Sequence, residues 1–204
     1  MVVRGSRGIC PAGWTGVVRL GDATLIEAGD ADDATIELVR SLDDPSEPAE
    51  VSRAVRLARS LGPAQLAYLP VGGQVAELDP GEAMREVSVA SIGGWLDSLP
   101  ETDVDESAVA EMDQVLVLRR GEQLLGAAGH LDRPGGIGHM GVLVAPGARG
   151  AGVGARLGAA ATQRVLDRGL TPQWRAAASN EASRRVARRI GYREVGRQFS
   201  FQVA

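Results

Sequence analysis

The hydrophobic pattern is most regular in the second half of the chain. Runs of apolar residues separated by Gly-Glu and Asp-Arg-Pro-Gly-Gly turns predict a strand hairpin followed by a third strand. Apolar side chains then recur at every fourth position from Val153 to Val165, which predicts a helix, and Gly169 follows at its C-terminal end. The expected order is strands over 113–120, 123–131 and 137–146, the helix from Val153, a strand over 171–178, a helix from Asn180 and a terminal strand over 193–204.

The first half of the chain carries shorter patterns. Residues 16–28 predict a hairpin around Gly21-Asp22, and three aspartates before residue 34 suit the first turn of a short helix over 34–42. The apolar positions of residues 51–61 predict a second helix, which Gly62-Pro63 would end. The remaining expectations are a loop over 43–50, short strands over 65–69 and 74–78, a helical stretch around Trp95 and an acidic linker over 101–107.

Composition narrows the chemistry. All 22 cationic side chains are arginines, which excludes Schiff-base catalysis by lysine, the GxxxxGK[ST] phosphate loop and a kinase-type lysine. The single cysteine, Cys10, excludes an internal disulfide, and two histidines, His130 and His139, leave little for a metal site. The chain shows no apolar run of about 18 residues and no signal-peptide pattern, so we expect a cytoplasmic protein without a membrane partner.

Charge is distributed unevenly. Residues 1–110 hold 8 arginines and 19 acidic residues, a formal charge of −11, whereas residues 111–204 hold 14 arginines and 7 acidic residues, a formal charge of +7. The basic half suggests an anionic ligand or the acidic half as its partner. The overall acidity and the lack of arginine–aromatic clusters speak against nucleic acid. The acidic half has two interpretations. Its acidic side chains form an ordinary solvated surface, or they form a negatively charged surface that attracts a cationic amine substrate.

A glycine-rich segment lies between the strand over 137–146 and the helix from Val153. Its sequence, V-A-P-G-A-R-G-A-G-V-G over 144–154, lets backbone N–H groups approach a ligand at the positive end of a helix dipole, which predicts an anion cradle. The alternative is a glycine-rich turn that binds no ligand. The letters GAGVGA also match the dinucleotide-binding fingerprint. Against that alternative stand the short remaining chain, the absence of an acid after the next strand, and the loop that begins at Pro146.

The same segment resembles the acyl-CoA signature of the GCN5-related N-acetyltransferase (GNAT) superfamily, V-x-P-x-x-R-G-x-G-x-G. Residues 180–192 resemble the family's second signature, N-x-x-[AS] followed by G-[FY]. The chain is similar to a bacterial branch with a divergent N-terminal lobe. The resemblance implies an α/β fold with a mixed, mostly antiparallel central sheet flanked by helices. It also implies a GNAT core over 92–204 and an additional α/β lobe over 1–91. One interpretation of that lobe is a degenerate GNAT-like half.

The resemblance implies acetyl-CoA as co-substrate and no metal. It assigns Val142, Leu143 and Val144 to backbone pairing with the pantetheine arm, and Asn180 to a pantetheine contact that is compatible with a helix N-cap. It places main-chain N–H groups around the pyrophosphate at Arg149, Gly150, Gly152, Val153, Gly154 and Ala155. The arginines of the second helix form a solvated face by default, with one of them a candidate for a CoA phosphate: Arg184, Arg185, Arg188 and Arg189.

The expected reaction is N-acetylation of a primary amine, on a small molecule or a peptide, by direct attack in a ternary complex. Val144 N–H is the family's oxyanion donor, and His139 is our candidate base, unless it points from the opposite face into the core or solvent; Glu106 and Asp132 are weaker candidates. The family's acidic tyrosine falls on Ala187, so Ser183, Tyr192 or water would replace it. That departure supports the alternative, a non-catalytic acyl-CoA-binding sensor or interaction domain. The protein is expected to be a monomer or a homodimer.

Overall fold

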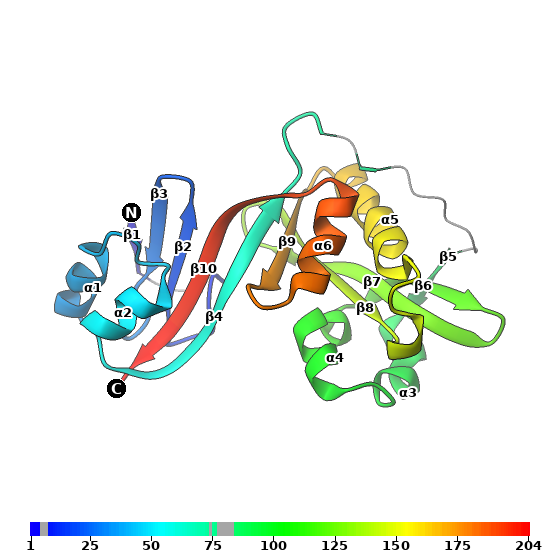
Figure 1. Ribbon diagram of the computed structural model, residues 1–204, viewed down its shortest axis with the longest axis horizontal. Helices are drawn as coiled ribbons and strands as arrows, with labels where there is room; N and C mark the ends of the chain where they lie inside the picture. The colour runs from blue at the N-terminus through cyan, green and yellow to red at the C-terminus, as the bar shows by residue number, and fades with distance from the viewer. Residues whose placement is uncertain (5–7, 74, 77–83) are drawn as a thin grey trace. The chain divides into compact units, whose positions relative to one another are not determined.

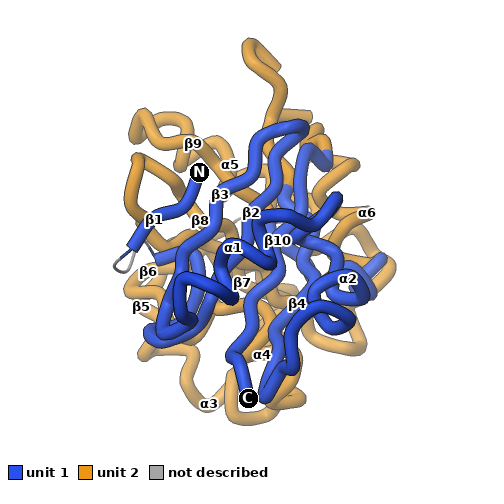
Figure 2. The backbone as a smooth tube through the Cα atoms, turned by 90° about the vertical axis from the view of Figure 1, so that its left-hand side faces the viewer, with its two compact units in different colours: residues 1–66, 175–181, 194–204 blue, residues 67–174, 182–193 orange. Residues whose placement is uncertain are grey.

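The computed structural model describes residues 1–4, 8–73, 75–76 and 84–204. The chain forms two compact units, each built from separate segments: unit 1 holds Met1–Leu66, Arg175–Glu181 and Glu194–Ala204, and unit 2 holds Ala67–Trp174 and Ala182–Arg193 (Figure 2). The expected division at residue 91 stays a prediction about the domains.

Unit 1 is built on a sheet with the strand order β1-β3-β2-β10-β4 (Figure 1). Strands β2 and β3 form the expected hairpin, because Leu20 pairs with Ala23 across the Gly21-Asp22 turn, where Gly21 has a φ of 55°. Strand β10 runs antiparallel to β2. The strands span Val2–Val3 (β1), Thr15–Leu20 (β2), Ala23–Glu27 (β3), Leu57–Tyr68 (β4) and Arg193–Val203 (β10).

Two helices complete the core of unit 1. Helix α1 (Asp33–Arg40) begins where the Asp32 carboxylate accepts the N–H of Thr35, which confirms the predicted short helix. Helix α2 (Pro48–Ala54) starts with its proline in the first turn. Their apolar faces share a buried cluster with the sheet, whose members include Ile26, Ile36, Val39, Val51, Phe199 and Phe201. Both phenylalanines of the chain, Phe199 and Phe201, lie on β10.

The predicted helix over 51–61 is wrong beyond its first turn. Helix α2 ends at Ala54, Val55 is already extended with φ −128° and ψ 136°, and β4 begins at Leu57. Strand β4 is hydrogen-bonded to β10, and these backbone bonds outweigh a local helix preference that is weak in any case. Gly62-Pro63 therefore lies within a strand. Residues 65–68 of the predicted strand over 65–69 form the end of β4, whereas most of the predicted strand over 74–78 lies outside the described residues.

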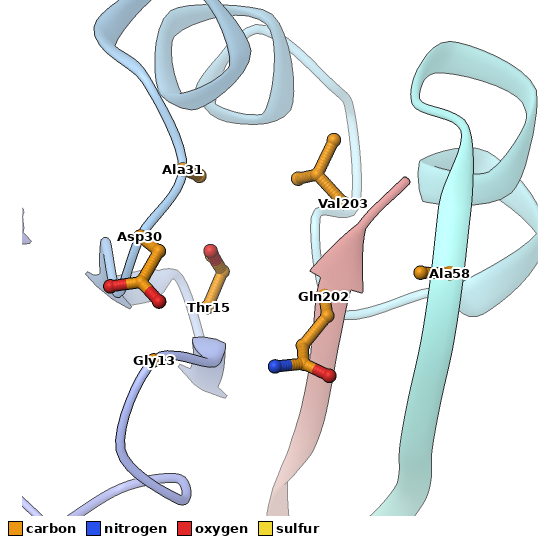
Figure 3. A pocket seen from close by; sticks show the side chains of 7 residues that line it. All are labelled: Gly13, Thr15, Asp30, Ala31, Ala58, Gln202 and Val203. Carbon is orange, nitrogen blue, oxygen red and sulfur yellow. The ribbon is translucent and has the colours of Figure 1, made fainter.

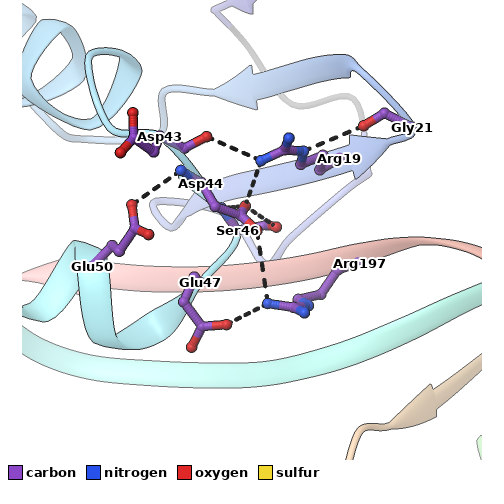
Figure 4. A network of polar contacts seen from close by, with 8 residues as sticks. All are labelled: Arg19, Gly21, Asp43, Asp44, Ser46, Glu47, Glu50 and Arg197. Atoms are coloured by element: carbon purple, nitrogen blue, oxygen red, sulfur yellow. Dashed lines mark hydrogen bonds and ion pairs between the residues drawn. The ribbon is translucent and has the colours of Figure 1, made fainter.

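An ion-pair network fixes the loop between α1 and α2 to the sheet of unit 1 (Figure 4). Arg19 on β2 and Arg197 on β10 are directly opposite each other in the register. Two like charges in this position repel each other and destabilise the pair of strands unless acidic side chains lie close to them. Asp44 supplies one, 3.3 Å from Arg19, and Glu47 forms an ion pair with Arg197. Asp44 also accepts the backbone N–H and the hydroxyl of the fully buried Ser46, at 3.0 and 2.6 Å. Burial opposes ionisation, yet these hydrogen bonds and Arg19 hold the pKa of Asp44 below its usual value.

Unit 2 contains the strand order β9-β8-β7-β6-β5. Neighbouring strands are antiparallel except β8 and β9, which run parallel. Four of the strands follow the sequence prediction closely, while β5 adds an edge strand that the pattern did not indicate. Their bounds are Met84–Ser88 (β5), Gln114–Arg120 (β6), Gln123–Arg133 (β7), Ile137–Val144 (β8) and Thr171–Ala177 (β9), of which unit 2 holds β9 up to Trp174.

The helices of unit 2 cover opposite faces of its sheet. Helix α5 (Val153–Asp167) packs on one face, where a β-carbon added at Gly138 would lie 2.5 Å from Val165 Cγ1. The turn Val109–Glu111 and helix α4 (Glu101–Ser107) pack on the other, where a β-carbon at Gly141 would lie 2.3 Å from Ser107 O. Helix α6 (Glu181–Ile190) follows β9, and the short helix α3 (Gly93–Leu96) contains the stretch predicted around Trp95.

The predicted acidic linker over 101–107 is wrong, because these residues form helix α4. Pro100 precedes the helix, and Glu101 and Asp103 in its first turn complement the positive end of the helix dipole. Val104 packs against the buried cluster that includes Val109, Met112 and Leu143, and so ties the helix to the sheet. No helix among the described residues is both long and apolar enough to cross a membrane.

Candidate functional site

Strand β8 separates from its parallel neighbour β9 partway along its length. The register pairs Ile137, Gly138 and His139 with Thr171, Pro172 and Gln173. Among the described residues, this pairing does not continue beyond His139, whereas pairing with β7 continues up to Val144. The last five residues of β8 therefore keep one strand neighbour and lack the other.

The backbone groups left without a strand partner belong to Val142 and Val144. Ala145 N–H donates to Leu125 O of β7 at 2.9 Å, and alternate residues of an antiparallel strand turn their N–H and C=O toward the same neighbour. Leu143 therefore turns toward β7, and its side chain lies in the core at 3% exposure. Of the three residues assigned to the pantetheine arm, Val142 and Val144 have the required backbone direction, and Leu143 has the opposite one.

The loop between β8 and α5 directs a run of N–H groups outward. Gly150 and Gly152 both have a φ of 79°, a left-handed conformation that favours glycine. Within the described residues, the N–H groups from Gly150 to Ala155 have no hydrogen-bond acceptor. The first turn of α5 holds no acid, and Gly152 at its N-cap offers no side chain. Six N–H donors at the positive end of a 15-residue helix form a cradle for an anion.

Two contacts hold this cradle against the sheet. A β-carbon added at Gly154 would lie 3.3 Å from Val144 Cγ2 and 3.6 Å from Val186 Cγ2, so the start of α5 is packed closely against β8 and α6. Arg149 anchors the loop: its own N–H donates to Pro146 O at 3.3 Å, and its guanidinium donates to Asp103 Oδ2 at 2.6 Å and, from Nε, to Val144 O at 3.4 Å. Its main-chain N–H is thus already engaged, unlike those of the six residues after it.

Asp103 is the site residue that the sequence analysis missed, because it was assigned to a linker. Two signals in the sequence indicate the helix: a proline at residue 100, and two acids within the next three positions. The partner of Asp103, Arg149, lies 46 residues later in the chain, and nothing in the local sequence specifies such a contact.

His139 lies on the sheet face that carries α4. Side chains at alternate positions of a strand share a face, and a β-carbon at Gly141, two residues on, would lie 2.4 Å from Met112 Cε on the α4 side. His139 is half-buried there, whereas Val142 and Val144 point their side chains toward α5. Glu106 belongs to α4 itself. The catalytic role of His139 stays a prediction.

The candidates for the acid differ in their surroundings. Tyr192 is 2% exposed, hydrogen-bonds Thr162 Oγ1 at 2.9 Å and stacks edge-on against Trp174, and burial raises its pKa well above the usual value. It is a core residue. Ser183 Oγ accepts the indole N–H of Trp174 at 3.0 Å, and its role as the acid stays a prediction. Ala187, at the family's tyrosine position, is 2% exposed.

Asn180 and Asp132 complete the predicted set. Asn180 lies directly before α6, and its backbone N–H donates to Ala177 O at 2.8 Å; its contact with pantetheine stays a prediction. Asp132 is held by Arg168, with Nη2 2.8 Å from Oδ2, and lies 3.3 Å from His130 Nε2. Its register partner is Gly138, so it shares the α5 face of the sheet and not the face of His139. This position weighs against Asp132 as the base.

The cluster of His130, Asp132 and Arg168 predicts a pH dependence of stability. Burial and the Arg168 guanidinium lower the pKa of His130 below its ordinary 6.5, and Asp132 only partly opposes them. As the pH falls through 6.5, His130 therefore takes up a proton more readily in the unfolded chain than in the folded protein. The free energy of unfolding decreases in this range by up to ~1.4 kcal/mol per pH unit. We expect His130→Gln to flatten this decrease, measured by urea unfolding between pH 7.5 and 5.

A second variant tests the same assignment in the opposite direction. Asp132→Asn removes the carboxylate that favours protonation of His130, so the pKa should fall further and the loss of stability below pH 6.5 should become larger. Parallel pH profiles for the wild type and both variants would contradict a role for His130.

A separate cavity lies in unit 1 (Figure 3). Its volume is about 230 Å³, below the 300 to 1,000 Å³ that is typical of sites for drug-sized ligands. The Asp30 carboxylate lines one side and the Gln202 amide another, while the Thr15 hydroxyl is engaged by Ala28 O at 2.8 Å. This cavity is too small for a nucleotide-sized ligand, and the glycine-rich loop remains the candidate site.

Comparisons with known proteins agree with this geometry. Residues 82–192 match the model of the acetyltransferase (GNAT) family. No curated protein matches the chain. Among solved structures, a GNAT-family acetyltransferase from Colwellia psychrerythraea is 15% identical with a TM-score of 0.56, and the match covers 73% of this chain and 59% of that one.

Two further structures are similar. A GCN5-related N-acetyltransferase from Kribbella flavida is 20% identical with a TM-score of 0.53, over 76% of this chain and 63% of that one. A tandem GNAT protein from the clavulanic acid biosynthesis pathway is 14% identical with a TM-score of 0.51, over 92% of this chain and 63% of that one. The chain thus spans 59–63% of the length of these three structures. At these identities the structures show the shared fold, and the family match covers more than half of the chain: the protein belongs to the GNAT acetyltransferase family.

Proposed function

We propose that this protein transfers the acetyl group of acetyl-CoA to a primary amine by direct attack in a ternary complex. The observation that carries the proposal is the cradle of six N–H donors at the start of α5, next to a strand whose outer edge lacks a partner. The diphosphate of an acyl-CoA would bind the N–H cradle, and its extended, amide-containing pantetheine arm would pair with the free edge of β8. The donor set matches both parts of one ligand.

In this proposal, the chain's residues act on a bound thioester as follows. The backbone of Val142 and Val144 pairs with the pantetheine arm as an added strand would. The N–H of Val144 faces the thioester carbonyl and stabilises the oxyanion that forms when the amine attacks. The amine must be neutral, so His139 accepts its proton, directly or through a water molecule. Ser183 donates its hydroxyl proton to the leaving thiolate and regains one from the attacking nitrogen, which loses a proton as the amide forms.

The acceptor is proposed to be a small molecule or a peptide that presents a primary amine. The acidic N-terminal half would attract such a cation, although the ion pairs of Arg19 and Arg197 neutralise part of that charge within unit 1. We also propose that residues 1–91 form a degenerate GNAT-like lobe. The similarity to a tandem GNAT protein over 92% of the chain is consistent with that proposal.

One observation favours a second function, an acyl-CoA-binding domain without turnover. The position at which the family carries an acidic tyrosine is Ala187, buried at 2% exposure, and Tyr192 is enclosed in the core. A domain that only binds acyl-CoA would need the cradle and the edge of β8 but no proton donor.

Two measurements separate the candidates. Titration calorimetry with acetyl-CoA, CoA and NAD tests the ligand class, and binding of the CoA species alone is expected. Thiol release from acetyl-CoA in the presence of a panel of amines then tests catalysis. Release that depends on an amine supports the transferase, whereas tight binding without release by any amine supports the sensor. Because the chain contains no lysine, acetylated product is not obscured by self-acetylation of lysine side chains.

A further inference from the structure

A row of polar side chains crosses three neighbouring strands of unit 2, the end of β4, β9 and β8 (Figure 1). Gln173 on β9 is the register partner of His139 on β8, so their side chains lie next to each other on one face of the sheet. Tyr68, the last residue of β4, is joined to Gln173 by a side-chain hydrogen bond. All three side chains are half-buried, so each keeps part of its surface accessible to a ligand.

The row lies on the face of the sheet opposite α5. Trp174, the next residue of β9, points toward α5, because a β-carbon added at Gly158 of that helix would lie 3.2 Å from Trp174 Cη2. Alternate residues of a strand point to opposite faces, so Gln173 points away from α5, as His139 does. Among the described residues, the pair of His139 and Gln173 is the last before β8 and β9 separate. The row therefore lies where the strands begin to open, on the side of the proposed base.

The hydrogen bond between Gln173 and Tyr68 determines what the two side chains offer to a ligand. Gln173 Nε2 donates and Tyr68 Oη accepts, which leaves the phenolic proton for a second partner. Within the described residues, Gln173 Oε1 receives no hydrogen bond and the Tyr68 hydroxyl makes no other. The pair thus presents a donor and an acceptor side by side, without a formal charge. A carboxamide has the complementary groups, whereas a carboxylate has no proton for Gln173 Oε1 and an alkyl group leaves both atoms unpaired.

We propose that Tyr68 and Gln173 bind a carboxamide of the acceptor, and that the acceptor is an α-amino amide, such as the amino-terminal residue of a peptide. The inference rests on the proposed function and names the substrate class for it. The Tyr68 O–H donates to the amide carbonyl, and Gln173 Oε1 accepts the amide N–H. Neighbouring strands are about 4.8 Å apart, so a group held by Gln173 lies one strand away from His139. In an α-amino amide, a single carbon separates the amine from the carbonyl, which suits this short spacing.

Two amines of similar size test the inference: glycinamide carries the carboxamide, and n-propylamine does not. Thiol release from acetyl-CoA gives kcat and KM for each amine at one pH. Comparing a variant with the wild type for the same amine cancels the difference in basicity between the two amines. We expect Tyr68→Phe to raise KM for glycinamide roughly three- to thirtyfold with little change in kcat, as for one lost hydrogen bond. Its KM for n-propylamine should change less than about twofold, because that amine makes no such bond.

Gln173→Met provides a second variant, since it removes both polar atoms of the amide and keeps the length of the side chain. It should raise KM for glycinamide and leave KM for n-propylamine nearly unchanged, as Tyr68→Phe does. The matched control is Gln163→Met on the exposed side of α5, where the Gln163 amide donates to Asp167 Oδ1 at 2.8 Å. This control should leave both KM values unchanged, and thermal unfolding should show all three variants folded.

The outcomes separate the inference from the proposed function. An equal rise in KM for both amines, or no rise for either, would overturn the inference and leave the proposed function in place. So would a wild-type protein that acetylates other amines and does not acetylate glycinamide. If no amine supports thiol release by the wild-type protein, the proposed function itself fails, and the inference with it.

Discussion

Gly152→Val is expected to reduce acetyl-CoA binding at least ~100-fold while the protein stays folded. The residue has a φ of 79°, which a β-branched side chain adopts only at a cost of about 1–3 kcal/mol. No atom of the protein lies closer than 4.0 Å to the added β-carbon, so the substitution does not create a clash within the fold. It instead places a branched side chain among the six N–H donors and forces the loop out of the conformation that aims them together. Calorimetric titration with acetyl-CoA measures the loss.

The matched control is Gly169→Val at the other end of the same helix. Gly169 has a φ of 72°, and a β-carbon there would meet no atom within 4 Å, so the backbone strain and the open surroundings are equivalent. We expect a comparable decrease in the free energy of unfolding and an unchanged Kd. Equal Kd values for Gly152→Val and Gly169→Val would show that the cradle does not hold the ligand.

His139→Ala is expected to lower kcat by at least ~10²-fold at unchanged affinity for acetyl-CoA. A base on the α4 face of β8 removes a proton from the amine but does not contact the cradle, so binding and turnover should separate. The remaining activity should rise with pH up to the pKa of the free amine, because only amine that is already neutral can react. Steady-state kinetics from pH 6 to 10 check both expectations.

His130→Gln serves as the control for this prediction. It replaces the other histidine of the chain, which lies on the α5 face of the sheet in contact with Arg168. Its kcat should equal that of the wild type. Turnover by His139→Ala at the wild-type rate would remove His139 from the mechanism, and Glu106 of α4 would then be the next candidate.

The regular patterns of the sequence predicted most of unit 2. Strands β6, β7 and β8 and helix α5 coincide with their predicted ranges to within a few residues, because their apolar patterns are regular and glycine or proline turns bound them. The glycine-rich loop lies between β8 and α5, where the sequence places it, and Gly150 and Gly152 have the left-handed conformation that favours glycine. Its role as an anion cradle stays a prediction.

The errors share one cause, namely contacts between residues far apart in the sequence. Residues 57–61 have a helical pattern, yet they join a strand because β10, more than 130 residues later, supplies hydrogen-bond partners. The acidic run over 101–107 resembles a linker until Val104 packs on the sheet and Asp103 meets Arg149.

The discontinuity of unit 1 has a consequence for how the chain can be divided. Its final strand, β10, comes from the end of the chain and pairs with β2, so it depends on residues near the start. A shortened chain that begins at residue 92 would lose β2 and β4 and keep β10 as an unpaired strand that exposes Phe199 and Phe201. Such an edge is a template for aggregation. The two ends of the chain therefore depend on each other in unit 1, and removing the first 91 residues leaves β10 without either neighbouring strand.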